Sequence, residues 1–279
     1  LAVVRQRTGR CLARQALAID PPRRSGRACA CDRMGRYGRI HRPHVRPKIQ
    51  QLVANDGIAG VAWQARIMPI KVLDQDAVGS AATLALGIRY AVANGAKIIN
   101  LSVSGPGYSQ AFEEAVQLAS ESGVIVVGAA GNDGRNVESD PVYPAGFSAP
   151  LLLTTAATGQ AGALAPVSNF GAATVELAAP GADIVATARG GGYERRTGTS
   201  MAAPHVAGAL VLLASARPQA GPTAWRDAVV QSARPGLAVG AGTLSVSGAL
   251  QIAMGTAFRR QTLGRTAAIR RTACALRRM

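Results

Sequence analysis

Acidic side chains are few in this sequence, and the deficit is confined to its two ends. The 279 residues include 15 Asp and Glu against 31 Lys and Arg, which gives a net charge of +16. Residues 1–50 hold 13 basic and two acidic side chains, and residues 251–279 hold seven basic side chains and no acidic one. Residues 51–250 hold 11 basic and 13 acidic side chains. Any electrostatic attraction to nucleic acid or to acidic membranes would therefore belong to the ends alone.

Cysteine is absent from residues 51–250, and aromatic residues make up only 4% of the chain. Few aromatic residues predict a core built mainly from Ala, Val, Leu and Ile. The ends hold four cysteines, whose spacing implies neither a disulfide framework nor a zinc site: Cys11, Cys29, Cys31 and Cys274. A weakly acidic, cysteine-free middle suits an exported bacterial enzyme and a cytosolic one equally well.

Long apolar runs are also missing from the sequence. No run approaches the roughly 18 residues that would indicate a membrane span, so we expect none. The apolar start at residues 1–4 is too short for a signal peptide, and no cleavage pattern follows it.

The middle of the chain alternates strand-like and helix-like segments. Short apolar runs predict strands at 65–73, 98–103, 124–129, 150–156 and 184–188. Apolar residues at helical spacing predict helices at 81–94, 109–121, 200–215 and 222–233. This order and the near-continuous apolar strands indicate an α/β fold, with a mainly parallel twisted sheet covered by helices on both faces. Residues 1–48 show no sustained period, and residues 257–279 are rich in Arg and Ala.

Ser200 lies in the most informative segment, Gly198 to Gly208, which reads GTSMAAPHVAG. A serine between a glycine turn and the first turn of a helix has an exposed hydroxyl near the positive end of the helix dipole. A helix-capping serine on an Ala-rich packing helix is the alternative. The whole string resembles the catalytic-serine motif of the subtilase family, which implies a three-layer subtilisin-like fold and peptide hydrolysis by Ser200.

The base that would activate Ser200 must come from three histidines. His205 lies five residues after Ser200, roughly 140° around the same helix, so it faces elsewhere. The resemblance places His41 at the catalytic histidine and His44 at the second, structural histidine of the family's His-Gly-Thr-His-Val-Ala-Gly motif. His41 precedes Ser200 by 159 residues, against about 157 in subtilisin. The motif is altered here, because Arg-Pro pairs replace its Gly-Thr and Ala-Gly.

The segment from Val127 to Gly134, which reads VGAAGNDG, predicts a second catalytic group. An Asn at the end of a buried strand can direct its amide at a developing oxyanion. By the resemblance, Asn132 forms the oxyanion hole together with the backbone N–H of Ser200. An ordinary Asn-Asp-Gly turn is the alternative.

The resemblance also implies a groove for a polypeptide substrate. Its strand edge comprises Ser102, Val103, Ser104 and Gly105. The walls of the S1 pocket, which takes the P1 side chain before the scissile bond, are Ala129, Ala130 and Gly131, and its floor includes Val142. Since many subtilases have Gly at the position of Val142, we expect a short pocket that favours small P1 side chains.

The acid of the triad has no clear counterpart in this chain. Asp20 follows a short apolar run but lies only 21 residues before His41, and Asp32 lies nearer still, so both are expected to be solvated charges. We therefore divide the chain into an atypical basic segment (1–48), a catalytic domain incomplete at its N-terminal side (49–256) and a basic tail (257–279). Our hypothesis is that the ends, at least the first, come from a shifted reading frame or a decayed gene. Upstream DNA whose other frames contain neither an Asp-Thr/Ser-Gly strand nor a His-Gly-Thr-His motif would contradict it.

Two alternatives remain open from the sequence. One is an inactive protein of the same fold that lacks the orienting acid. The other is a binding protein whose basic ends contact nucleic acid or acidic membranes, although no nucleic-acid fold motif is present and no nucleic-acid partner is expected. No organic cofactor is implied. The family often binds Ca²⁺, but no complete set of oxygen ligands can be identified, and no metal ligand is predicted. By resemblance the location is secreted or periplasmic, and the oligomeric state is open.

Overall fold

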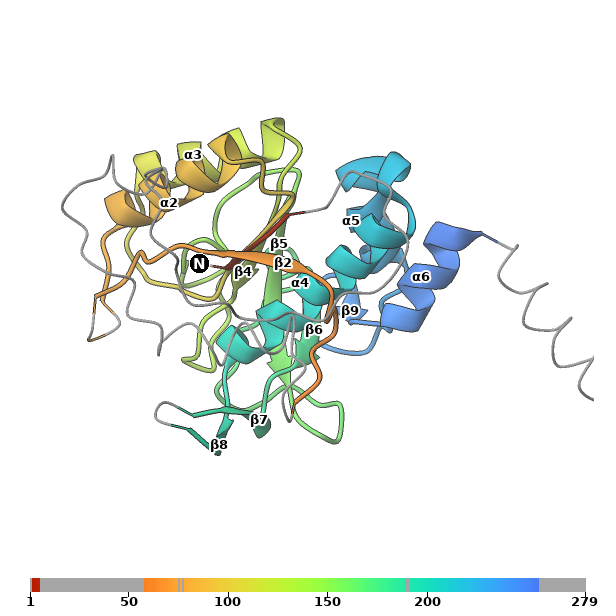
Figure 1. The fold of residues 1–279 in the computed structure, drawn as a ribbon. Coiled ribbons are helices and arrows are strands. Elements are labelled where there is room, and N and C mark those ends of the chain that lie inside the picture. The colour runs from red at the N-terminus through yellow and green to blue at the C-terminus, as the bar shows by residue number, and fades with distance from the viewer. Residues whose placement is uncertain (1, 6–57, 75, 77, 189–190, 256–279) are drawn as a thin grey trace, which may run out of the picture.

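The computed structural model describes residues 2–5, 58–74, 76, 78–188 and 191–255. In this part of the chain a single large sheet lies between two groups of helices (Figure 1). The strands of the sheet, in spatial order, are β2 (Arg66–Pro69), β1 (Ala2–Arg5), β3 (Ile98–Leu101), β4 (Ile125–Ala129), β5 (Leu152–Thr158), β6 (Leu177–Pro180) and β9 (Gly242–Thr243). A separate hairpin is formed by β7 (Ile184–Thr187) and β8 (Tyr193–Arg196).

The sheet is parallel from β3 through β9, as the sequence predicted. The exception is β1, which pairs antiparallel with both of its neighbours, so that Ala2 lies opposite Pro69 on β2 and Asn100 on β3. Residues 2–5 thus form a strand within a segment, 1–48, whose sequence shows no sustained period. Four residues are too few for a period to be recognised, and only pairing at long range makes them a strand.

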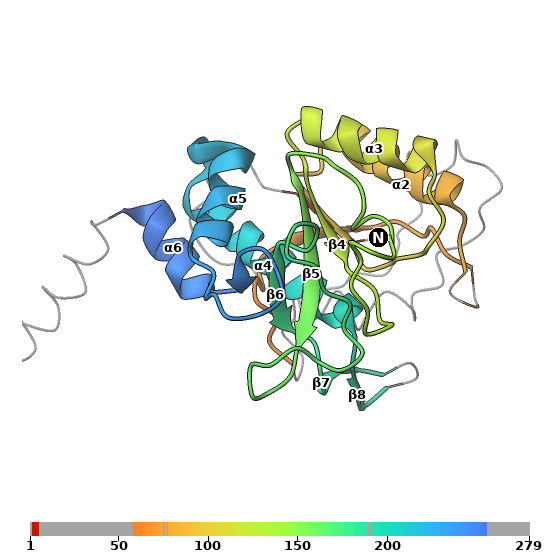
Figure 2. The same cartoon turned by 180° about the vertical axis from the view of Figure 1, so that it is seen from behind.

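One group of helices comprises α2 (Ala81–Ala93) and α3 (Gln110–Glu121), and the other comprises α4 (Thr199–Ala216), α5 (Gly221–Gln231) and α6 (Val246–Met254). Figures 1 and 2 show the two groups on opposite sides of the sheet. Strand β4 explains why both faces need a cover: Ile125 and Val127 pack into the core with α4, and Val126 packs into the core with α2 and α3. Successive side chains of a strand point to opposite faces, so an all-apolar strand requires helices on both.

Local signals fixed the ends of α2 and α3 almost where the sequence placed them. Ser80 caps α2 through a capping box with Thr83, whose backbone N–H donates to the Ser80 hydroxyl at 3.1 Å. Gly95 and Gly123 follow the two helices with φ of 73° and 71°, a conformation that glycine adopts without strain.

Elsewhere the predicted strands differ from the observed ones. β2 ends at Pro69 rather than at residue 73, because its described partner β1 offers only four residues to pair with. The strand predicted at 184–188 belongs to the separate hairpin and not to the main sheet. The short strands β6, β8 and β9 and helix α6 were not predicted.

Helix α4 has the length of a membrane span, although no span was expected from the sequence. With 18 residues it is the one helix in the described ranges that is long and apolar enough to cross a membrane. However, 72% of it is buried inside the molecule, where it packs on the sheet and on α5 and α6. A helix enclosed in this way is the core helix of the fold, and the membrane test by itself is weak support for a span.

Glu176 gives the fold a testable dependence on pH. Its carboxylate accepts hydrogen bonds from the Thr154 backbone N–H at 2.7 Å and the Thr154 hydroxyl at 2.6 Å. Burial raises the pKa of Glu176 above its ordinary 4.5, although the Thr154 hydrogen bonds oppose this. The folded protein therefore binds this proton more tightly than the unfolded chain, and that contribution to stability is lost as the pH rises from 4.5 through the raised pKa.

Replacing Glu176 by Gln is expected to flatten this part of the pH dependence. Relative to the native protein, Glu176→Gln should gain stability between pH 4 and pH 7, because its side chain has no proton to lose. Thermal unfolding across this range measures the difference, with Glu121→Gln on the exposed surface of α3 as the control. Parallel curves for the native protein and Glu176→Gln would contradict the account.

Candidate active site

Ser200 lies in the first turn of α4, directly after Gly198 and Thr199. Pro204 lies four residues further on inside the same helix and has no N–H to donate to the Ser200 carbonyl. The Ser102 hydroxyl, just past the end of β3, donates to that carbonyl at 3.0 Å. The Ser200 hydroxyl in turn donates to the Ser102 carbonyl at 3.1 Å. Because Pro204 cannot donate, the Ser200 carbonyl remains available to accept from Ser102, and this hydrogen bond links Ser200 to the end of β3.

Removing the Ser102 hydroxyl is expected to weaken this reciprocal pair. Ser102→Ala leaves the partly buried Ser200 carbonyl without its donor and the buried Asn100 amide without its acceptor, which together should cost about 1–3 kcal/mol of stability. Chemical denaturation measures the loss, and Ser104→Ala two residues away is the control. Equal stability of Ser102→Ala and the native protein would show that these contacts contribute nothing.

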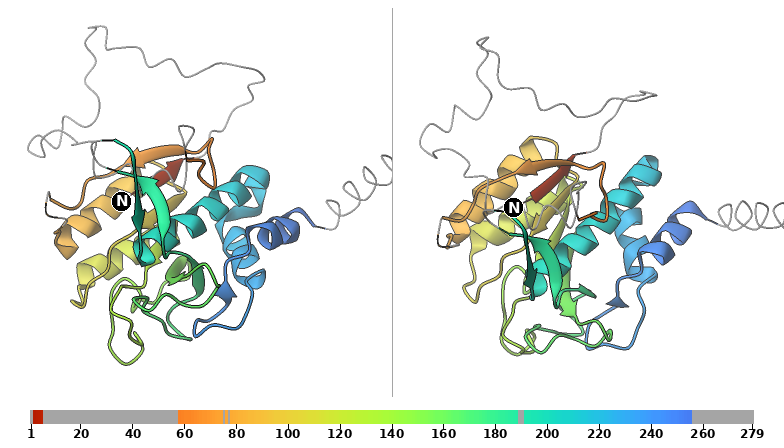
Figure 3. Two further views of the ribbon diagram at one scale, coloured as in Figure 1. Left: turned by 90° about the horizontal axis from the view of Figure 1, so that it is seen from below. Right: turned by 60° about the horizontal axis from the view of Figure 1, so that its bottom comes forward.

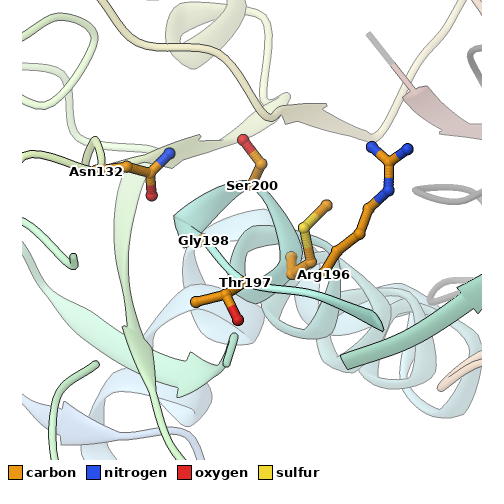
Figure 4. A pocket seen from close by; sticks show the side chains of 6 residues that line it. Asn132, Arg196, Thr197, Gly198 and Ser200 are labelled. Carbon is orange, nitrogen blue, oxygen red and sulfur yellow. The ribbon is translucent and has the colours of Figure 1, made fainter. Parts of the chain in front are cut away.

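Asn132 meets the start of α4 from the loop that follows β4. Its Oδ1 accepts from the Thr199 backbone N–H at 2.8 Å and from the Thr199 hydroxyl at 3.0 Å. The oxygen is thereby engaged, and the amide nitrogen is directed toward Ser200 (Figure 4). A Cβ at Gly198 would come within 3.2 Å of Asn132 Oδ1, so glycine at this position permits the close approach.

Asn169, which sequence reasoning missed, supports the loop that holds Asn132. It is fully buried, and its Nδ2 donates to the Ala130 carbonyl at 3.0 Å. Its Oδ1 accepts from the backbone N–H groups of Asp133 at 2.9 Å and Arg135 at 3.2 Å. Its own backbone N–H donates to the Gly131 carbonyl at 3.0 Å. One side chain thus satisfies backbone groups on both sides of Asn132. A buried Asn far along the chain gives no local signal for such a role.

The structure brings Ser200 and Asn132 to one open pocket of about 310 Å³. Gly198, Thr197, Arg196 and Met201 complete its lining. In a helix the first backbone N–H groups have no partner within the helix. Among the described residues, the N–H of Ser200 has none. This free donor and the Asn132 amide offer two hydrogen bonds to a negatively charged oxygen beside the Ser200 hydroxyl.

Some residues predicted to form the substrate groove have backbone groups that are already hydrogen-bonded, and others are buried. The N–H and carbonyl of Gly105 both bond to Tyr143, at 3.0 and 2.8 Å, so these groups are already engaged within the protein. Ala129 and Ala130 are buried, and Val142 is only 2% exposed and packs in the same apolar cluster as Ala130. Val142 is therefore part of the apolar core, and it is not among the residues that line the pocket beside Ser200.

His205 bonds to its own helix and not to Ser200. Its Nδ1 lies 2.9 Å from the Met201 carbonyl, and burial lowers the pKa of its imidazole below the ordinary 6.5. The other two histidines, His41 and His44, and the acids Asp20 and Asp32 lie outside the described residues. Within those residues, the partner of the Ser200 hydroxyl is a carbonyl and not a base.

Among the residues that the structure describes, no three His, Cys, Asp or Glu side chains lie together to hold a metal ion. Asp74, one of two acids in a loop, accepts hydrogen bonds from the backbone N–H groups of Asp76 and Val78. No step of the chemistry is therefore assigned to calcium.

Known proteins with the same features are serine proteases. The model of the Subtilase family matches residues 49–261. A thermostable alkaline protease of Halalkalibacterium halodurans is 40% identical over 178 residues, covering 64% of this chain and 48% of the relative. Subtilisin E of Bacillus subtilis is 36% identical over 195 residues, covering 70% and 49%. The chain thus spans about half the length of these curated relatives.

Solved structures with a similar fold are also proteases. The prenylagaramide maturation protease PagA superposes with a TM-score of 0.68 at 28% identity, covering 74% of this chain and 80% of that one. The patellamide maturation protease PatA superposes with a TM-score of 0.67 at 31% identity, covering 75% and 83%.

Proposed function

Because this chain belongs to the subtilase family, we propose that it is a serine endopeptidase that hydrolyses peptide bonds through an acyl-enzyme on Ser200. The observation that carries the proposal is the pairing of Ser200 with Asn132 at one pocket. The Asn132 oxygen is occupied by Thr199, so its amide nitrogen remains to donate. A hydroxyl beside two such donors is the arrangement that acyl transfer needs.

In the proposed reaction, Ser200 Oγ attacks the carbonyl carbon of the scissile bond. The carbonyl oxygen becomes an oxyanion and accepts hydrogen bonds from Asn132 Nδ2 and the Ser200 backbone N–H. A base takes the serine proton and returns it to the leaving amine. Water then hydrolyses the ester and frees Ser200. We assign the base to His41, the histidine whose spacing and motif resemble those of the family.

The substrate is proposed to be an extended polypeptide aligned along residues 102–105, with its P1 side chain against residues 129–131 and toward Val142. Main-chain hydrogen bonds to a strand edge give affinity with little dependence on side chains. We propose residues 49–256 as the catalytic domain, flanked by the basic segments 1–48 and 257–279, and a secreted or periplasmic location.

A catalytically impaired protein of the same fold is the second candidate. The Ser200 hydroxyl donates to the Ser102 carbonyl, which cannot take its proton. No acid stands at the expected distance before His41, and in subtilisin the loss of that acid alone lowers kcat by about 3 × 10⁴. Under this alternative the chain binds peptides at the same groove but hydrolyses them very slowly.

Incubation of the full chain with an unstructured protein substrate tests the proposal. Mass spectrometry should detect new peptide termini that accumulate with time, and Ser200→Ala should form none under the same conditions. Cleavage that persists in Ser200→Ala would come from a contaminant or another site. Absence of cleavage by both proteins would favour the impaired form.

A further inference from the structure

Arg196 lines the same pocket as Ser200 and Asn132, and among the described lining residues it is the only charged one. Figure 4 shows its side chain extending from the end of β8 on the side of Ser200 that faces away from Asn132. Helix α4 begins in the same pocket, where its dipole contributes further positive potential. Arg196 and the start of α4 therefore place two sources of positive potential beside the nucleophile.

The guanidinium of Arg196 is paired with Glu194 and can still bind a second anion. Its Nε donates to Glu194 Oε1 at 2.8 Å, and its Nη2 lies 2.6 Å from the same oxygen. Its Nη1 has no partner among the described residues. The side chains of Arg196 and Glu194 are 44% and 35% exposed, and such solvated pairs are easily exchanged. A carboxylate from a substrate can therefore bind beside Glu194 or replace it.

The position of Asn132 indicates which part of the substrate reaches Arg196. In the proposed reaction the P1 residue lies against residues 129–131, which end β4 and begin the loop that carries Asn132. The scissile carbonyl carbon lies at Ser200 Oγ, so the residues after the scissile bond extend from Ser200 away from residues 129–131. The residue directly after the scissile bond (P1′) then lies on the side of Arg196 (Figure 4).

We propose that this protein selects peptides with an acidic P1′ side chain, Asp or Glu, and that Arg196 is the specificity-determining residue. The inference rests on the proposed function and narrows its substrate class. It differs from a general attraction of acidic peptides to a basic chain, because the described core is weakly acidic and the charge in question is a single guanidinium at the pocket.

The neighbouring Arg195 provides a matched control. Successive side chains of a strand point to opposite faces, so Arg195 and Arg196 of β8 leave on different sides. Arg195 Nη1 donates to Asp183 Oδ2 at 2.7 Å, and Arg195 does not line the pocket. The two arginines are adjacent in the chain and carry the same charge, but only Arg196 faces Ser200.

The test measures binding, so that it does not depend on the rate of hydrolysis. The full-length Ser200→Ala protein is titrated with fluorescent peptides that differ only at P1′, which is Glu, Gln or Lys, and Kd is read from fluorescence anisotropy at low salt. We expect the Glu peptide to bind roughly fivefold more tightly than the Gln peptide, and the Lys peptide to bind more weakly than Gln. Raising the salt concentration to 0.5 M should remove most of the difference.

Variants in the same background assign the effect to one side chain. Arg196→Gln should abolish the preference, Arg196→Glu should reverse it toward Lys, and Arg196→Lys should retain it in part. Arg195→Gln should leave it unchanged. Circular dichroism confirms that each variant is folded, which we expect because Arg196 is exposed.

Two negative results have different meanings. Equal Kd values for the three peptides, or a preference that survives Arg196→Glu, would overturn the assignment of Arg196 while leaving the proposed protease intact. Failure of the Ser200→Ala protein to bind any of the peptides would overturn both the proposed substrate groove and this inference.

Discussion

Replacing His41 by Ala is expected to lower the reactivity of Ser200 by about four to six orders of magnitude. Without a base, a serine hydroxyl at neutral pH is a poor nucleophile. In subtilisin, removal of the histidine alone lowers kcat by about 2 × 10⁶. The rate of acylation by a peptide ester measures the effect, because esters react faster than amides and extend the range of detection.

A control three residues away separates catalysis from folding in this segment. His44→Ala should retain most of the activity, since the resemblance gives His44 a structural place. Added imidazole should restore part of the rate to His41→Ala by supplying the missing base from solution. If His41→Ala reacts like the native protein, the base lies elsewhere and the proposed register of the histidine motif is wrong.

Replacing Asn132 by Ala is expected to lower kcat by about 10²–10³ with little change in KM, because in the proposed reaction its amide binds the oxyanion and not the ground-state carbonyl. Asn132 also accepts from Thr199, so the alanine variant loses two functions at once. Asn132→Asp separates them: it keeps the acceptor for Thr199 and removes the donor.

Comparable losses of kcat in Asn132→Ala and Asn132→Asp would identify the donor as the important group. Asn94→Ala at the end of α2 is the control, because its Nδ2 donates only to the Tyr90 carbonyl far from the pocket. A loss in Asn132→Ala that Asn132→Asp does not share would indicate that Asn132 only positions the start of α4.

Much of the fold could be predicted from local patterns. The strands β3 and β4 are short and almost wholly apolar, and glycines follow α2 and α3, so local sequence patterns define these elements without tertiary information. Strand β9 could not be found in this way. It comprises two residues, Gly242 and Thr243, which form a strand because they pair with β6 more than 60 positions earlier.

The same distinction separates the predicted from the unpredicted parts of the site. Ser200 and Asn132 stand in distinctive motifs, and the structure places both at one pocket. The bonds that position them connect distant segments: Ser102 contacts Ser200 across 98 residues, and Asn169 contacts Asp133 across 36. Nothing local marks Ser102 or Asn169 for these contacts, which depend on how α4 and the loops meet at the end of the sheet (Figure 3).

Arg196 illustrates a third case. Sequence reasoning predicted a strand at 184–188 but missed its partner β8, so the hairpin and its charged end were not placed. Figure 3 shows this hairpin standing where α4 begins. Its four residues, Tyr193 to Arg196, are mostly polar and lack the apolar alternation by which strands are recognised.

Labelling of the purified full chain with a fluorophosphonate probe reports whether Ser200 is activated, because the probe forms a covalent bond with an activated serine. We expect labelling of the native protein at Ser200, located by mass spectrometry of the modified peptide, and none of Ser200→Ala. A native protein that remains unlabelled, or that is labelled equally when Ser200 is replaced, would contradict the claim that Ser200 is a working nucleophile.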